Sequence, residues 1–184
     1  MDVFQAIDER HSYRGAFTDE PVPSDDLRAI VEAGLEAPSG CNAQSTRFVI
    51  VNDPQLTDRI NAMPEANTPI RQARAFIVCI VDRNPPDVYK GLSFQIEDCA
   101  AAVQNMLLAV TALGYATVWI DGWLRKDGRA ETLGHWLGLP TGKTARILLP
   151  IGRPAETVQR KEKMPFEERA WFNQYGSPVS LSEQ

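Results

Sequence analysis

The stretch Leu92–Leu113, LSFQIEDCAAAVQNMLLAVTAL, contains neither glycine nor proline. Its apolar residues recur every three or four positions from Ile96 to Leu113, which predicts one long helix. Alanine and leucine fill most of the other positions, so this helix is apolar nearly all round. Such a helix is buried, either in the centre of a domain or at an interface between subunits. Gly114 follows it and suits a C-terminal cap.

The rest of the chain is a mixture of short strands and helices. Strands are predicted at Arg47–Asn52, Ala75–Val81, Ala116–Ile120 and Ala145–Ile151. Helices are predicted at Val3–Glu9, from Ser24 to about Leu35, and at Pro54–Met63, Arg129–Leu137 and Pro165–Tyr175. Their interspersed order, without any repeat, indicates a single domain of α/β or α+β class over residues 1–176, followed by a loose tail over 177–184.

The sequence also predicts the burial of one strand, the N-cap of one helix and the position of one loop. The strand Arg47–Asn52 does not alternate apolar and polar residues, so we expect it to be buried on both faces. Ser24 has the chemistry of an N-cap for the helix that follows Pro23. Ala66–Ala73 shows no helical or strand period and is expected to be a loop.

Composition narrows the classes of function. The chain has 184 residues, a net charge of −5 and three cysteines, Cys41, Cys79 and Cys99. An acidic chain argues against binding to nucleic acid or to an anionic membrane. The cysteine spacing and the two histidines give no recognisable zinc site and do not favour a disulfide framework, so Cys79 and Cys99 are expected to be buried packing residues. With no signal peptide and no membrane-length apolar run, we expect a cytoplasmic protein.

The connector Ala37–Phe48 is more polar than a turn requires. Its amides, Asn42 and Gln44, both donate and accept hydrogen bonds and suit a neutral ligand with alternating donors and acceptors. Ser39, Ser45 and Thr46 add three hydroxyl groups. By itself this pattern favours an ordinary hydrogen-bonded turn over a ligand-binding loop.

Three further clusters stand at the ends of predicted elements. Arg10, His11, Ser12 and Arg14 form the first, and their guanidinium groups suit a phosphate. The second is Asp121-Gly122, where a glycine directly after a strand permits close approach of the backbone to a ligand. Arg160, Lys161 and Lys163 form the third. Each of these clusters could also be an ordinary solvated turn or charge run.

Several well-known catalytic motifs are missing from the sequence. There is no G-x-G-x-x-G after a strand, no P-loop, no G-x-S-x-G and no metal-ligand spacing. His135 has no obvious catalytic partner. Because no nucleophile can be matched with a base, an enzyme of this sequence would need a cofactor to perform its chemistry.

Four motifs in order carry a resemblance to a known family: Glu9–Phe17, Ala37–Gln44, Val103–Ala109 and Ile151–Glu156. Together they resemble the FMN-dependent nitroreductase family over roughly Val3 to Trp171. The resemblance implies an α+β sandwich with a central, mainly antiparallel sheet flanked by helices, built as an intertwined homodimer. Two tightly but non-covalently bound FMN molecules would lie at the subunit interface.

The resemblance also implies which residues hold the cofactor. Arg10, His11, Ser12 and Arg14 would meet the phosphate and the pyrimidine side of the ring, and Lys161 and Lys163 would close on the phosphate. Pro38, Ser39, Asn42 and Gln44 would reach the flavin of the other subunit. A backbone amide near Asp121 and Gly122 would meet flavin N5, and Asn67, with Arg71, would lie near the ring. No metal and no catalytic side chain is implied.

The activity implied is transfer of hydride from NAD(P)H through flavin N5 to an oxidised acceptor, such as a nitroaromatic or a quinone, in a ping-pong cycle. Reductive dehalogenation, flavin breakdown, or a flavin-binding sensor or storage module stay open as alternatives. Two features depart from many relatives: Ser45-Thr46 replaces an aromatic residue after the loop, and the segment Asn52–Arg74 is short. The site would then be open, or roofed by Asn84–Leu92.

Overall fold

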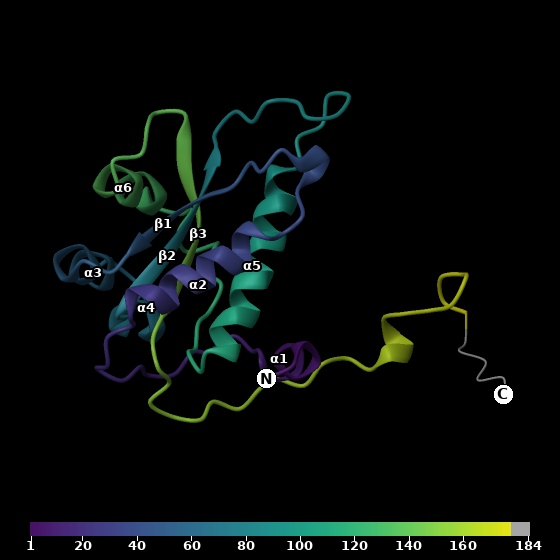
Figure 1. Cartoon of the computed structure of the whole chain (residues 1–184), viewed down its shortest axis with the longest axis horizontal. Coiled ribbons are helices and arrows are strands. Elements are labelled where there is room, and N and C mark those ends of the chain that lie inside the picture. The colour runs from purple at the N-terminus through teal and green to yellow at the C-terminus, as the bar shows by residue number, and fades with distance from the viewer. Residues whose placement is uncertain (178–184) are drawn as a thin grey trace.

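The computed structural model describes residues 1–177 as an α+β fold (Figure 1). Residues 178–184 of the expected tail lie outside the described residues. In chain order, the elements are α1 (Val3–Glu9), α2 (Ser24–Leu35), the 3₁₀ turn η1 (Gly40–Asn42), β1 (Arg47–Val51), α3 (Pro54–Asn61), α4 (Thr68–Gln72), β2 (Ala75–Asp82), α5 (Gln95–Ala112), α6 (Arg129–Trp136), β3 (Lys143–Ile151) and the 3₁₀ turn η2 (Phe166–Glu168).

The three named strands form an antiparallel sheet in the order β1-β2-β3. Strand β2 lies in the middle, and its side chains alternate between two buried clusters. Phe76 and Val78 belong to one cluster, whereas Ile77 and Cys79 belong to the other. Since both faces are covered, β2 is apolar throughout.

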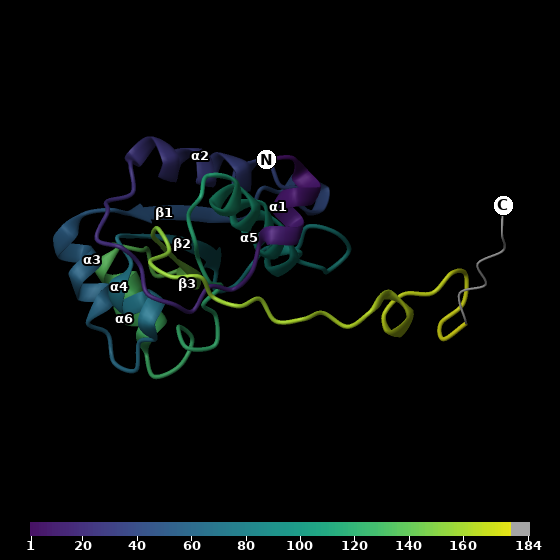
Figure 2. The same cartoon turned by 90° about the horizontal axis from the view of Figure 1, so that it is seen from below.

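Helices cover both faces of this sheet (Figure 2). On one face α2 and α5 pack against Ile77 and Cys79. On the other face α3, α4 and α6 close the second cluster around Phe76. The long helix predicted at Leu92–Leu113 is confirmed as α5, and Gly114 follows its last turn with a φ of +77°.

The expectation for the first strand is wrong in one respect. Strand β1 lies at the edge of the three-stranded sheet and is largely exposed or half-buried, with Ile50 38% exposed. Phe48 and Val49 reach opposite clusters but are only partly covered. An unbroken apolar run therefore does not distinguish a central strand from an edge strand whose two faces are each half covered.

The strand expected at Ala116–Ile120 is also absent as a continuous strand. The segment makes two isolated bridges instead, from Ile120 to Leu148 of β3 and from Ala116 to Gly152, the residue after β3. In that register Pro150 stands opposite Val118, at the position where a hydrogen-bonded pair would be expected. Because proline has no N–H, the ladder breaks in the middle.

Three helix predictions need correction. Pro23, not Ser24, occupies the N-cap of α2, and Ser24 Oγ instead accepts a hydrogen bond from Asn52 Nδ2 at 3.0 Å. The expected loop Ala66–Ala73 contains the five-residue helix α4, which is too short to show a period. Its start is fixed by the Asn67 side chain, which accepts from Ile70 N at 3.1 Å.

The predicted last helix Pro165–Tyr175 is wrong except for the single turn η2. This part of the chain projects away from the domain (Figures 1 and 2), and Met164, Phe166, Phe172 and Tyr175 are more than half exposed. A short helix is marginal in water unless an apolar face is packed. Within residues 1–177 the projecting segment has little to pack against.

The two inner cysteines are packing residues, as expected. Cys79 on β2 and Cys99 on α5 are 0% and 1% exposed. A hydrogen bond between their thiols raises the pKa of Cys79 and lowers the pKa of Cys99. Cys41 is exposed on the loop that contains η1.

Candidate cofactor site

A small basic cavity brings together two clusters that are about 150 residues apart in sequence. Arg10, His11, Ser12 and Arg14 leave the end of α1, and Arg160, Lys161 and Lys163 return along the C-terminal segment to meet them. Together with Val158 and Gln159 they line a cavity of about 210 Å³. We call this set the basic cavity.

Most cations of the basic cavity are not neutralised by carboxylates. Within residues 1–177, Arg10, Arg14, Lys161 and Lys163 make no ion pair. Arg160 is the exception, since its Nη1 lies 2.9 Å from Asp8 Oδ1. In a chain of net charge −5, such a gathering of unpaired cations favours an anionic ligand.

His11 adds a polar atom that the protein leaves without a partner. Its Nδ1 lies 2.9 Å from the carbonyl oxygen of Glu9, whereas Nε2 is buried and has no partner in the described chain. If Nδ1 carries the proton and donates to Glu9, Nε2 is left as an acceptor; in the imidazolium form it is a donor. A buried polar atom of this kind is normally satisfied by water or ligand.

Tyr13 fixes the backbone of this cluster. Its N–H donates to Thr117 O at 2.9 Å, and its hydroxyl donates to Ala16 O. The Tyr13 side chain is almost completely buried, and this burial raises its pKa. The residues on either side of Tyr13 are therefore held close to the segment that leads to Asp121.

The amide loop, defined as Ala37–Phe48, lies at the other end of the molecule's long helix. Asp98 in the first turn of α5 ties it down, because Oδ1 accepts from Gly40 N at 2.8 Å and Oδ2 accepts from Ser45 Oγ at 2.7 Å. A Cβ on Gly40 would overlap the Phe94 ring, so only glycine fits there. The basic cavity, in contrast, follows α1, which packs near the C-terminal end of α5 (Figure 1).

The backbone of the amide loop is strained. Cys41, Asn42 and Gln44 have φ angles of 50°, 55° and 48°, a region that non-glycine residues seldom adopt. Gln44 Nε2 donates to Asn42 Oδ1 at 3.3 Å, and Ser39 Oγ accepts from Gln44 N at 3.0 Å. Such strain often marks a functional segment.

A cavity of about 620 Å³ lies beside the amide loop, and Pro38, Ser39 and Gln44 are among the residues that line it. Asn42 is exposed but is not part of the lining. The apolar share of the wall comes from Val31, Leu35, Phe48 and Ala102.

The Asp121-Gly122 pair is presented on a turn whose flanks are anchored. Asp121 Oδ1 accepts from Arg125 Nε at 2.5 Å and also from Arg146 Nη1. Gly122 is exposed, and a Cβ built on it would meet no atom within 4 Å. Its N–H makes no backbone hydrogen bond within the described chain and is free to meet a ligand.

The structure thus joins some of the predicted residues and separates others. The two basic clusters meet in one cavity, whereas the amide loop lies beyond the opposite end of an 18-residue helix about 27 Å long. Asn67 uses its side-chain oxygen to cap α4, and Arg71 is exposed near the end of that helix.

Two residues that no sequence pattern indicated, Asp98 and Arg129, hold the amide loop and the turn after Gly122 respectively. Other charged residues stand close to each of them in sequence, such as Glu97 beside Asp98 and Asp127 near Arg129, and several of their partners are remote, so no local signal marks them.

Comparison with known proteins gives the family. The model of the nitroreductase family matches residues 7–86 and 70–153. The chain belongs to the nitroreductase family. It is 30% identical over 168 residues to the oxygen-insensitive NADPH nitroreductase of Salmonella typhimurium, a match that covers 86% of this chain and 69% of the relative.

Two other nitroreductase-family relatives are informative. The FMN reductase [NAD(P)H] of Bacillus subtilis is 28% identical over 181 residues, covering 90% of this chain and 71% of that protein. The crystal structure of a nitroreductase with bound FMN from Bacteroides fragilis superposes with a TM-score of 0.69 at 28% identity, covering 90% of this chain and 95% of the other. The predicted family and the predicted fold class are therefore confirmed.

Membrane-spanning helices and metal-binding clusters are both absent from the described residues of this nitroreductase-family chain. None of its helices over residues 1–177 has the length and apolarity that crossing a membrane requires. In the same part of the chain, no three His, Cys, Asp or Glu side chains gather where they could hold a metal ion.

Proposed function

We propose that this member of the nitroreductase family is an FMN-dependent oxidoreductase that passes hydride from NAD(P)H to an oxidised acceptor, such as a nitroaromatic or a quinone, in a ping-pong cycle. Its relatives include proteins named as an NADPH nitroreductase and an NAD(P)H-dependent FMN reductase. Bound FMN would supply the hydride chemistry. The protein's own residues would bind, orient and shield it.

The observation that carries this proposal is the basic cavity. Four cations without carboxylate partners surround about 210 Å³ of space in an acidic protein. Arg10 and Arg14 could grip phosphate oxygens through two N–H groups at once, while Lys161 and Lys163 add point charges. Ser12 supplies a neutral donor, so the set fits a phosphomonoester.

The other predicted contacts supply neutral groups, as a flavin edge requires. The free N–H of Gly122 is a donor in an open position, and Asn42 and Gln44 offer amides. Among the predicted site residues, none is assigned as a dedicated acid or base. One pocket used in turn by two different substrates benefits from this lack of specialisation.

We further propose that the protein is a homodimer in which the amide loop of one subunit serves the cofactor of the other. The basic cavity is smaller than the roughly 300–1,000 Å³ of a typical whole-ligand pocket, so one subunit supplies only part of a site. The amide loop cannot complete it within the same subunit, because α5 separates the two. A second copy related by a twofold axis could bring the missing half.

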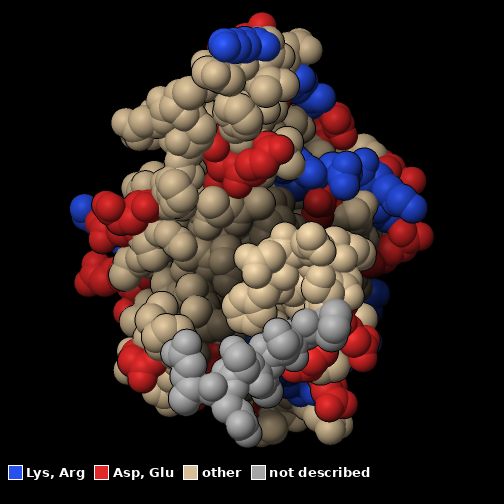
Figure 3. Space-filling model, turned by 90° about the vertical axis from the view of Figure 1, so that its right-hand side faces the viewer, with Lys and Arg blue, Asp and Glu red and all other residues tan. Residues whose placement is uncertain are grey.

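Exposed apolar surface supports the same arrangement. Phe4 on α1 and Phe172 and Tyr175 on the projecting segment are 81%, 64% and 90% exposed. Figure 3 shows a face that is mostly uncharged and hollowed in its middle, with charged side chains mainly around its margin. Large apolar side chains left exposed in this way commonly mark a protein interface.

A visible spectrum of the purified protein tests the proposal. We expect flavin absorbance after incubation with FMN, bleaching on anaerobic addition of NADH or NADPH, and recovery when a quinone or nitroaromatic is added. A protein that gains no flavin absorbance would rule the proposed function out. Bleaching without recovery by any acceptor would instead favour a sensor or storage role. Product analysis under oxygen separates flavin breakdown from reduction of the acceptor.

A further inference from the structure

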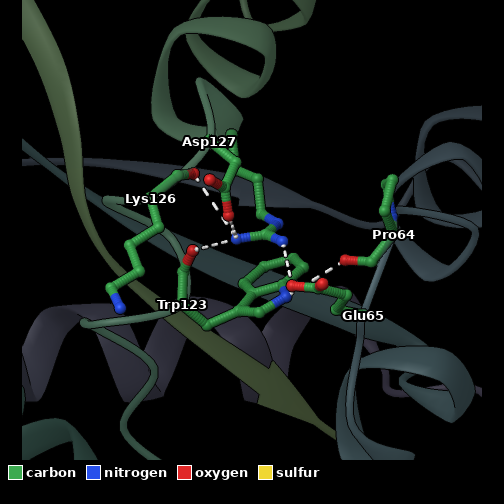
Figure 4. A network of polar contacts seen from close by, with 6 residues as sticks. Pro64, Glu65, Trp123, Lys126 and Asp127 are labelled. Atoms are coloured by element: carbon green, nitrogen blue, oxygen red, sulfur yellow. Dashed lines mark hydrogen bonds and ion pairs between the residues drawn. The ribbon is translucent and has the colours of Figure 1, made fainter.

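Arg129 is an almost completely buried charge at the start of α6. Its side chain is only 6% exposed, yet its two ion-pair partners, Glu65 and Asp127, are 76% and 70% exposed. Nη2 lies 2.6 Å from Glu65 Oε2, and Nη1 lies 2.9 Å from Asp127 Oδ2 (Figure 4). The two carboxylates therefore reach inward from the surface to a fixed guanidinium.

The same guanidinium holds Trp123, the residue after Gly122. Arg129 Nη1 donates to Trp123 O at 3.1 Å, and the guanidinium carbon lies 5.0 Å from the centre of the indole ring. Trp123 Nε1 donates in turn to Pro64 O at 3.2 Å (Figure 4). Arg129 and Trp123 thus join two segments that are distant in sequence, residues 62–67 and residues 121–128.

Both segments contain a strained residue at the point where Arg129 holds them. Glu65 and Asp127 have φ angles of 57° and 54°. A residue of this kind in the left-handed region is held there at a cost in free energy and persists only when its surroundings enforce it. Here the enforcing group is one guanidinium, that of Arg129, which donates to both carboxylates.

Gly122 depends on this anchoring for its position. Apart from its two chain neighbours, no atom of the described residues lies within 4 Å of a Cβ built on Gly122, so we expect those neighbours to place its peptide. On one side Asp121 is held by Arg125 and Arg146, and on the other side Trp123 is held by Arg129. The exposed N–H of Gly122 lies between two anchored residues.

We infer that Arg129 is a positioning residue that fixes the Gly122 peptide, and the segment before Asn67, against the flavin. This inference rests on the proposed function, in which Gly122 donates to the flavin, and on the expected place of Asn67 near the ring. Arg129 would touch neither cofactor nor substrate. Its role is to keep a hydrogen-bond donor aligned during hydride transfer, where misplacement by about 1 Å can cost up to a hundredfold in rate.

The test is Arg129→Met, which keeps an unbranched apolar stem but removes the charge and all donors. In hydrogen–deuterium exchange of the full-length protein, we expect faster exchange over residues 62–67 and 121–128. The affinity for FMN should change less than about threefold, since the basic cavity is untouched, while the rate of flavin reduction by NAD(P)H falls about tenfold or more. Arg129→Lys should recover little of the lost protection from exchange or of the lost reduction rate, because an ammonium cannot reproduce the planar, forked set of donors of a guanidinium.

Arg153→Met is the matched control. Arg153 also has an ion pair, 2.9 Å to Glu20, and lies 4.7 Å from the ring centre of Tyr115, but it joins other elements. The Arg153→Met substitution should leave hydrogen exchange over residues 62–67 and 121–128 unchanged, and likewise the rate of flavin reduction by NAD(P)H. If Arg129→Met does not fold, Glu65→Gln removes one exposed partner and should still speed exchange over 62–67.

Each other outcome is informative. Unchanged exchange in both segments would show that packing alone holds the two turns, and would overturn the inference that Arg129 anchors them. Faster exchange with an unchanged reduction rate would make Arg129 a structural residue only and overturn its positioning role. If the wild-type protein binds no FMN, the proposed function and the positioning role fail together. The exchange data still decide whether Arg129 anchors residues 62–67 and 121–128.

Discussion

The basic cavity and the amide loop differ in how their polar groups are used. In the cavity, Arg10 and Arg14 have no carboxylate partner, and His11 Nε2 is buried without any partner in the described chain. In the loop, Asp98 takes up Gly40 N–H and the Ser45 hydroxyl, and Asn42 and Gln44 bond to each other. The cavity therefore has unpaired cations that an anionic ligand could neutralise. The polar groups of the loop are largely paired within the chain, so the loop can keep its shape while it contacts a neighbouring subunit.

This difference has a thermodynamic consequence. Binding an anion to unpaired cations breaks no existing ion pair, so the cavity can supply most of the affinity. The loop must keep its strained backbone at all times, and Asp98 provides the compensating hydrogen bonds. We expect cavity variants to act on cofactor affinity and loop-anchor variants to act on local stability.

The largest effect is expected when the cavity loses its guanidinium groups. Arg10→Gln combined with Arg14→Gln removes two charge-assisted contacts, each worth about 1.5–3 kcal/mol, so the Kd for FMN should rise by about a hundredfold or more. Titration followed by flavin fluorescence measures it. Arg28→Gln, in an exposed pair on α2, is the control for the loss of one positive charge, half of the change in the double variant, and should leave the Kd unchanged.

Mixing of variants tests whether the loop serves the partner subunit. One variant carries Arg10→Gln and Arg14→Gln, and the other carries Asn42→Ala and Gln44→Ala. In a mixed dimer one site then combines a normal cavity with a normal loop. After unfolding and refolding of an equal mixture, about a quarter of the wild-type sites should reappear. Recovery no greater than the sum of the two separate variants would mean that the loop serves its own subunit or that no dimer forms.

A smaller effect is expected from the anchor of the loop. Asp98→Ala removes the acceptors of two hydrogen bonds and leaves Gly40 N–H without a partner, so the free energy of unfolding should fall by about 2 kcal/mol. Urea denaturation measures the change. Asp98→Asn should recover part of it, since the amide still offers one acceptor to Gly40. Glu97→Ala, which alters the same helix turn at an exposed position, should cost much less; an equal loss would contradict the anchoring role.

Periodicity and turn chemistry were sufficient for much of the fold. The central helix, the buried strand β2 and the short helices α1, α3 and α6 follow from local pattern, because each pattern is repeated along the element itself. The failures occur where the deciding partner is remote. Val118 is apolar, but Pro150, which stands opposite it between the two isolated bridges, cannot donate a hydrogen bond. The segment from Pro165 has helical composition, but the described chain offers it no surface to pack against.

For the site, the sequence alone determined which chemical groups are present: cations in two clusters, amides in one loop, and a glycine after Asp121. Those residue types are local facts and needed no structure. Only the tertiary structure decided that the two basic clusters share one cavity, that α5 keeps the amide loop away from it, and that Asp98 and Arg129 hold the strained segments. Such contacts join residues dozens of positions apart, and their geometry is set by packing of the whole domain, which a local pattern does not record.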